Sequence, residues 1–134
     1  MTFLDSNIFV YSVDIRDSKK QRMAKSIVMD ALKSADFIIS TQVLNEFAHV
    51  SLRKLGKHSD EVKSFLELLR PIRTVQIAPE WTSLAIDIME DYGIQFYDSL
   101  ILAAAEANGC DEILTEDLND GQTYCGVRAV NPFK

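Results

Sequence analysis

Residues 92–122, YGIQFYDSLILAAAEANGCDEILTEDLNDGQ, predict one buried helix followed closely by one short strand. Apolar residues lie on nearly every side of a helix over residues 98–108, which is the pattern of a helix surrounded by protein. Its three consecutive alanines permit close packing on a sheet, and Gly109 suits the position just after a helix. Residues 112–115 then have the short apolar pattern of a strand. A buried helix leading into a strand indicates a sheet that helices cover.

The same alternation of helix and strand patterns runs through the rest of the chain. Short apolar runs predict four further strands, at residues 2–5, 37–40, 74–77 and 127–130. Apolar spacing, caps and breakers predict helices at 18–35, 41–55, Ser59 to before Pro71, and Pro79 to Gly93, with a short helix or turn at 7–13. We therefore expect a three-layer α/β/α sandwich with a central parallel sheet of about five strands, in a single domain covering residues 1–134.

Composition restricts the classes of function. Acidic residues outnumber basic ones by 20 to 14 among 134 residues, so the chain does not have the charge of a protein that binds nucleic acid through a basic surface. Cys110 and Cys125 have no CxxC spacing, which argues against a zinc site or a disulfide framework and favours free thiols in a reducing cytoplasm. No charged leader precedes an apolar run, and no run approaches the roughly 20 residues of a membrane helix. We expect a cytoplasmic protein with no membrane contact.

Four carboxylates occupy related places in this plan. Asp5 ends the first strand, and Asp117 lies just beyond the fourth. Open parallel sheets place their sites outside these strand ends. Asp98 begins the buried helix, and Glu46 lies within the helix of residues 41–55.

Converging carboxylates repel one another, and burying them without a partner is costly. A divalent cation removes both problems, and oxygen-rich sites suit magnesium or manganese. Two such ions, about 3.5–4 Å apart, can activate water and stabilise the leaving oxygen in phosphodiester hydrolysis. Bound cations would also bring phosphates to an acidic protein.

Each acid also has a purely structural interpretation. Asp98 suits a helix cap, and Asp5 suits a turn after a strand. Glu46 alone is typical of an exposed helix position. Asp117 stands in a composition typical of a solvated turn, with neighbours Glu116, Asn119, Asp120 and Gly121. Their joint placement at the expected edge of the sheet is what favours a site.

Four segments resemble the PIN-domain family, in particular toxin ribonucleases of the VapC type. They are FLDSNIFVY (residues 3–11), STQVLNEF (residues 40–47), the long segment of residues 92–122, and VNPF (residues 130–133). With the order of helices and strands, the resemblance covers essentially the whole chain. It implies an endoribonuclease that uses Mg²⁺ or Mn²⁺, acts on an RNA substrate, forms a homodimer and is bound by a cognate antitoxin protein.

The resemblance also implies roles for individual residues. The family's metal-binding and catalytic acids match Asp5, Glu46, Asp98 and Asp117. Positions that support the centre through hydrogen bonds match Ser6, Asn7 and Thr115. The family's fourth acid varies in place, so Asp120 is a rival or helper to Asp117.

Three other functions were compared with this hypothesis. A phosphatase of the haloacid dehalogenase type needs a second aspartate two residues after the first, and Asn7 stands there. Glu46 and His49 form the E-x-x-H pair of di-iron bundles, but such centres need two copies and a four-helix core, so we expect His49 on the helix surface. A PIN-like fold that serves only as a binding or scaffold module stays open. RNA degradation that requires manganese and stops with a chelator would separate it from the enzyme.

Overall fold

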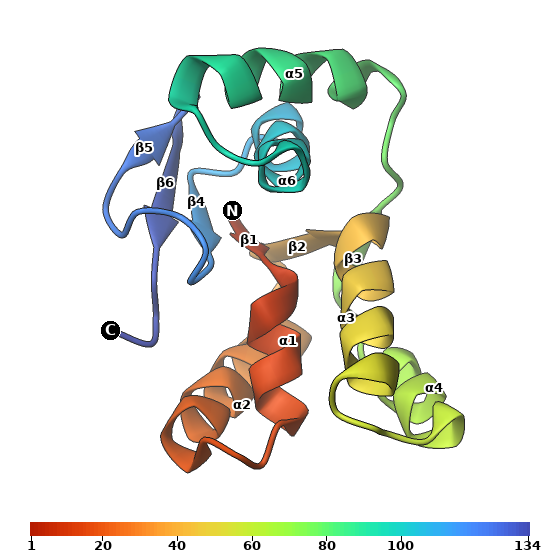
Figure 1. Ribbon diagram of the computed structural model, residues 1–134. Helices are drawn as coiled ribbons and strands as arrows, with labels where there is room; N and C mark the ends of the chain where they lie inside the picture. The colour runs from red at the N-terminus through yellow and green to blue at the C-terminus, as the bar shows by residue number, and fades with distance from the viewer.

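The computed structural model describes all of residues 1–134 and contains six strands and six helices (Figure 1). The strands are β1 (Thr2–Leu4), β2 (Phe37–Ser40), β3 (Arg73–Val75), β4 (Glu112–Leu114), β5 (Thr123–Tyr124) and β6 (Val127–Val130). The helices are α1 (Ser6–Val13), α2 (Ser18–Lys33), α3 (Thr41–Arg53), α4 (Ser59–Leu68), α5 (Glu80–Tyr92) and α6 (Phe96–Ala107).

One sheet, in the order β3-β2-β1-β4-β6-β5, forms the middle layer. All neighbouring pairs are parallel except β5 and β6. Helices α1 to α4 lie on one side of the sheet, and α5 and α6 lie on the other (Figure 1). The expected three-layer sandwich with a parallel sheet is therefore confirmed.

The antiparallel strand β5 is an addition to the five strands expected. It pairs with β6 through a tight turn in which Cys125 has φ 44° and Gly126 has φ 84°. Two positive φ angles are those of the hairpin turn that matches the twist of its strands, and such turns usually contain Asn-Gly or Asp-Gly. Cys-Gly is not that signal, and a strand of two residues has no periodicity to detect.

The beginnings of α1 and α6 change the structural interpretation of two acids. Asp5 is the N-cap of α1, and its side chain accepts a hydrogen bond from the Ser6 backbone N–H. Helix α6 begins at Phe96, two residues before the expected start, with Gln95 as its N-cap. Asp98 therefore lies inside the first turn and is not the cap. Asp5, which suits a turn after a strand in the sequence, thus caps a helix, and Asp98, which suits a helix cap, does not.

The core is built from the inner faces of these layers. Residues 99–105 of α6 are all buried, as expected for the helix that is apolar on nearly every side, and α6 packs between the sheet and α5. Phe3 and Leu4 of β1 have no exposed surface. Both cysteines are free, with Cys110 buried and Cys125 partly buried. No helix here combines the length and the apolar character that crossing a bilayer requires.

The strand order places a switch point between β1 and β4. The chain runs outward from β1 to β2 and β3, then returns across the sheet to add β4 on the other side of β1. Open α/β sheets bind ligands at such a reversal, outside the carboxyl ends of the strands. Leu4 pairs with Leu114, so Asp5 and Thr115 leave the sheet side by side, and the Asp5 N–H donates to the Leu114 carbonyl at 3.1 Å.

Candidate active site

Asp5 lies at the centre of the switch point and is held from two sides. Only 3% of its surface is exposed. Its Oδ1 atom accepts from the Ser6 N–H at 2.6 Å, because Asp5 caps α1. Its Oδ2 atom accepts from the Thr115 hydroxyl at 2.7 Å. The contact with Thr115 joins the ends of β1 and β4, 110 residues apart in the chain.

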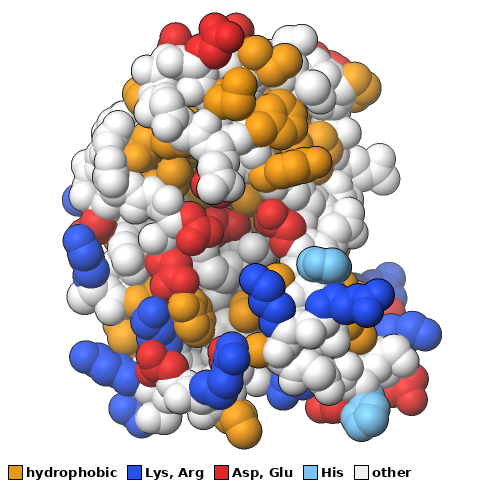
Figure 2. Space-filling view, viewed as in Figure 1, with side chains coloured by type: hydrophobic (Ala, Val, Ile, Leu, Met, Phe, Trp, Pro, Cys, Tyr) orange, Lys and Arg blue, Asp and Glu red, His pale blue; other side chains and the backbone are white.

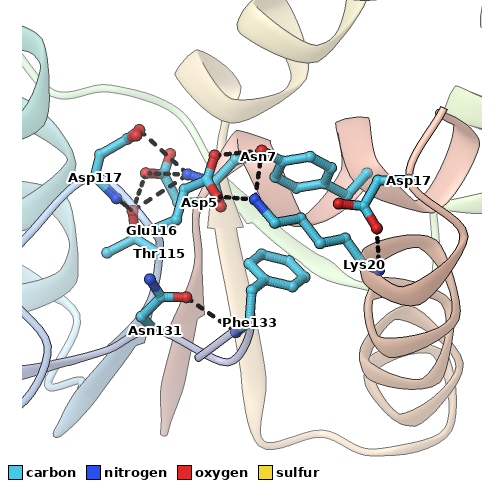
Figure 3. Close-up of polar contacts among 10 residues, drawn as sticks. Asp5, Asn7, Asp17, Lys20, Thr115, Glu116, Asp117, Asn131 and Phe133 are labelled. Atoms are coloured by element: carbon cyan, nitrogen blue, oxygen red, sulfur yellow. Dashed lines mark hydrogen bonds and ion pairs between the residues drawn. The ribbon is translucent and has the colours of Figure 1, made fainter.

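Asn7 and Thr115 connect Asp5 to Asp117 (Figure 3). The Asn7 Nδ2 atom lies 3.4 Å from Asp5 Oδ2, 3.3 Å from Thr115 Oγ1 and 3.2 Å from Asp117 Oδ2. Thr115 Oγ1 in turn accepts from the Asp117 N–H at 3.1 Å. The Asn7 amide thus lies between the carboxylates of Asp5 and Asp117 and contacts both. The supporting positions expected at Asn7 and Thr115 make direct contacts with both acids, whereas Ser6 contributes chiefly its backbone N–H.

Glu46 and Asp98 approach the same region from helices. Glu46, in the second turn of α3, is half-buried, and its Oε1 atom is enclosed by protein with no hydrogen-bond partner. Asp98, in the first turn of α6, is half-buried. Helices α3 and α6 lie on opposite sides of the sheet (Figure 1), so the two acids come to this edge from different layers.

The acids act on one another electrostatically. Burial raises the pKa of Asp5 to about 7, with the charges of Asp117 and Glu46 adding to the rise and the Thr115 hydroxyl opposing it. Burial also raises the pKa of Asp98 to about 6, again with the charges of Asp117 and Glu46 contributing. The pKa of Glu46 is raised by burial and by Asp117, against the nearby Gln42 and Ser6 side chains. Burial raises the pKa of Asp117 as well. Removing the repulsion between these charges requires protons or a cation.

The oxygen atoms of these acids suit a hard divalent cation that keeps part of its water shell. The donor set consists of carboxylate oxygens, and Glu46 Oε1 is buried without a donor. No group of three or more Asp, Glu, His or Cys side chains lies close enough together to hold a metal ion by itself. Magnesium, however, keeps several of its waters and is usually held by one or two carboxylates together with substrate phosphates. The residues present therefore fit magnesium or manganese and do not fit a structural zinc site.

Asp120 has a different place from the other acids. It is exposed, and its Oδ1 atom accepts from the Asn131 N–H at 2.8 Å, which ties the loop after β4 to the end of β6. The charges that raise the pKa values of Asp5, Glu46 and Asp98 include Asp117 and do not include Asp120. Of the two rivals for the fourth position, Asp117 is the one whose charge acts on the other three acids, and its role as the fourth acid stays a prediction. His49 is exposed on α3, as expected.

A second polar group beside the cluster was missed in the sequence. The Tyr11 hydroxyl donates to Glu116 Oε1 at 2.6 Å, and Lys20 Nζ lies 3.2 Å from both Tyr11 Oη and Glu116 Oε2. Phe133 packs edge-on against Tyr11, with 4.9 Å between the ring centres. This group fastens the loop that carries Asp117 to α1 and α2 (Figure 3). Tyr11 follows Asn7 by one helical turn on α1, so the i,i+4 spacing in the sequence already places both side chains on the same face of that helix.

One face of the molecule carries a group of acidic side chains between two unlike surfaces. Figure 2 shows this group of Asp and Glu side chains in a hollow in the middle of the face, with hydrophobic side chains above it and Lys, Arg and His side chains below and beside it. The net charge of −6 is therefore not spread evenly over this face, because basic side chains border the acidic ones there.

A parallel α/β sandwich with acids gathered at its switch point defines the class of protein. Residues 2–119 match the model of the PIN domain, and the chain belongs to this family.

Three solved structures with this fold are similar over nearly their whole length. A toxin–antitoxin complex from Klebsiella pneumoniae shares 19% identity and a TM-score of 0.74, covering 98% of both chains. VapC20 of Mycobacterium tuberculosis, a toxin that cleaves the sarcin–ricin loop, shares 17% identity and a TM-score of 0.71, covering 96% of this chain and 99% of its own. FitAB bound to an IR36 DNA fragment shares 18% identity and a TM-score of 0.70, covering 100% of this chain and 96% of its own. No curated protein matches the chain by sequence. At these identities the similarity is one of fold.

Proposed function

We propose that this protein is a divalent-metal-dependent endoribonuclease and the toxin of a toxin–antitoxin pair. The observation that carries the proposal is that Asp5, Glu46, Asp98 and Asp117, from four separate segments, act on one another's charges near the switch point of a PIN-domain sheet. Similar structures include a toxin–antitoxin complex and a toxin that cleaves the sarcin–ricin loop. The cytoplasm, where RNA and an antitoxin are available, is the proposed place of action.

Asp5, Glu46, Asp98 and Asp117 are the residues that would hold Mg²⁺ or Mn²⁺. Such an ion, when bound, lowers the pKa of water and neutralises charge on phosphate oxygens, which is the chemistry that hydrolysis at phosphorus needs.

The protein's own groups prepare these acids. Thr115 and Asn7 donate to Asp5 Oδ2, and Ser6 N–H donates to Oδ1, so the carboxylate is fixed in one orientation. Asn7 also donates to Asp117 Oδ2 and limits the movement of an otherwise exposed side chain. With a pKa of about 7, Asp5 holds a proton for part of the time at neutral pH, and it would have to be ionised to hold a cation. The fixed orientation reduces the ordering that cation binding would otherwise require.

A cleavage panel tests the activity. Single-stranded RNAs are incubated with the protein and Mn²⁺, and again with excess chelator. We expect endonucleolytic products only with the metal, and none from Asp5→Asn. Attack by water leaves a 5′-phosphate and a 3′-hydroxyl. Products that end in a 2′,3′-cyclic phosphate would contradict the proposal, because they arise from attack by the ribose 2′-hydroxyl. A panel that stays intact while the protein still binds RNA would favour the scaffold module instead.

Metal binding is measured separately by melting curves with and without Mn²⁺. Binding to the folded state alone raises its stability by about 2.7 kcal/mol when the free ion is at a hundred times its dissociation constant. We expect this gain in the wild type and its loss in Asp5→Asn and Asp98→Asn. Asp30→Asn is the matched control, because Asp30 is exposed on α2. Equal stabilisation of all four proteins would refute a shared metal site.

A further inference from the structure

A cavity of about 500 Å³ opens beside Glu46, at the border of the acid cluster. It lies between α3, the start of α1, the segment before α5 and the start of α6. Its lining includes Gln42, Glu46 and His49 from α3, Ser6 from α1, and Ile77, Tyr97 and Leu100. Because Glu46 belongs to both the cavity and the acid cluster, a ligand in the cavity adjoins whatever the acids hold.

Gln42 supplies an acceptor that has no donor. The residue is only 6% exposed, and its Nε2 atom donates to the Tyr97 carbonyl at 3.0 Å. Its second amide hydrogen faces Glu46, so both N–H groups are used, while the Oε1 atom is buried with no hydrogen-bond partner. Leaving a buried acceptor unpaired costs free energy, and a ligand that brings a donor recovers it.

Tyr97 supplies an exposed flat surface at the same cavity. Tyr97 is 63% exposed, although it lies in the first turn of α6. Phe96 packs edge-on against it, with 5.3 Å between ring centres and 83° between ring planes, and this contact limits the movement of the ring. Ile77 and Leu100 extend the apolar wall. An aromatic face beside apolar side chains is the surface on which single-stranded nucleic acids stack their bases.

We propose that this cavity receives the nucleobase of a nucleotide next to the scissile phosphate, stacked on Tyr97 and donating an exocyclic amino hydrogen to Gln42 Oε1. The inference rests on the proposed ribonuclease function and adds a base preference to it. Adenine, cytosine and guanine carry an exocyclic amino group, whereas uracil has only its ring N3–H as a donor, so a contact made to the amino group favours the first three. An apolar side chain of a protein partner would fill the same space but would leave the Gln42 acceptor unpaired, which is why a base is the occupant that fits.

The test compares two RNA octamers that differ in one chemical group. One is built of adenosine and the other of purine riboside, which has the same ring without the amino group. Cleavage with Mn²⁺ gives kcat and KM for the wild type and for four variants, Gln42→Met, Tyr97→Ala, Tyr97→Phe and Met29→Ala. Melting curves with and without Mn²⁺ show whether each variant is folded and still binds the ion. Met29, exposed on α2 and absent from the cavity lining, provides the control.

The two halves of the site give different signatures. Removal of the stacking ring in Tyr97→Ala raises KM for both octamers about tenfold, with stabilisation by Mn²⁺ unchanged, and Tyr97→Phe restores the wild-type KM. The wild type prefers adenosine over purine riboside by about fivefold in kcat/KM, and Gln42→Met removes this preference without a comparable change for purine riboside. Met29→Ala behaves as the wild type.

The outcomes separate this inference from the function on which it rests. If the wild type cleaves neither octamer nor any RNA of the panel, the proposed function fails and the base site falls with it. If the wild type cleaves RNA but Tyr97→Ala keeps the wild-type KM, the base site alone is refuted. A preference for adenosine that persists in Gln42→Met refutes the assigned hydrogen bond and with it the base selection.

Discussion

Replacing Asp5 by Asn should make the metal-free protein more stable at pH 8. The pKa of Asp5 is raised from 3.8 to about 7, mainly by burial. Each pKa unit corresponds to about 1.4 kcal/mol, so keeping this carboxylate ionised in the folded protein costs about 4 kcal/mol above pH 7. Asn carries no charge and still caps a helix about as well as Asp. It loses the Thr115 hydroxyl as a donor to Oδ2, which costs about 1 kcal/mol. The net expectation is a gain of about 3 kcal/mol at pH 8.

The pH dependence gives the sign of the effect. A carboxyl group whose pKa is higher in the folded than in the unfolded state binds its proton more tightly when folded, so stability falls as pH rises from about 4 to about 7. Between pH 5 and pH 8 the wild type should lose about 3 kcal/mol through Asp5, and Asp5→Asn should lose none of that amount. The two proteins should therefore differ by less than about 1 kcal/mol at pH 5.

Urea unfolding in excess chelator at pH 5, 6, 7 and 8 measures this difference. Asp30→Asn is again the control and should stay within about 0.5 kcal/mol of the wild type at every pH, as exposed substitutions do. The reasoning is refuted if Asp5→Asn is less stable than the wild type at pH 8, or if the gap between the two proteins does not widen from pH 5 to pH 8.

Three further expectations concern the loop of Asp117 and the assembly. Tyr11→Phe removes the donor to Glu116 Oε1 and should lower the free energy of unfolding by about 1 kcal/mol. It should also weaken Mn²⁺ binding, because the loop that carries Asp117 is no longer held to α1. Calorimetric titration with Mn²⁺ measures the affinity, and an unchanged affinity would show that the loop does not need this contact. The protein should form a homodimer, so light scattering at tens of micromolar that gives the monomer mass would remove that proposal. A cognate antitoxin should co-purify with the protein from its native host, and an Arg of that antitoxin should pair with the acids. Recovery of this chain alone, together with no growth defect on overexpression, would count against a toxin.

The elements of the fold were predictable because their signals are local. Strands β2 and β6 have the bounds expected from their apolar runs, and α6 is the buried helix that its uniform hydrophobicity indicates. Gly93 ends α5 in the left-handed conformation with φ 66°, which glycine adopts without steric cost. The missed strand, β5, is two residues long and depends on its pairing with β6, so its cause lies outside its own sequence.

The sequence by itself determined which carboxylates stand at strand ends and helix starts, since hydrophobic periodicity and capping are decided within a few residues. Only the tertiary structure decided how those acids relate. Strand order brings the ends of β1 and β4 together, and with them the contact between Asp5 and Thr115 across 110 residues. The fixed amide of Gln42 beside an exposed Tyr97 also arises from packing between distant segments, as do the contact of Asn7 with Asp117 and that of Asp120 with Asn131. Burial and hydrogen-bond pairing depend on neighbours that the chain supplies only after it has folded.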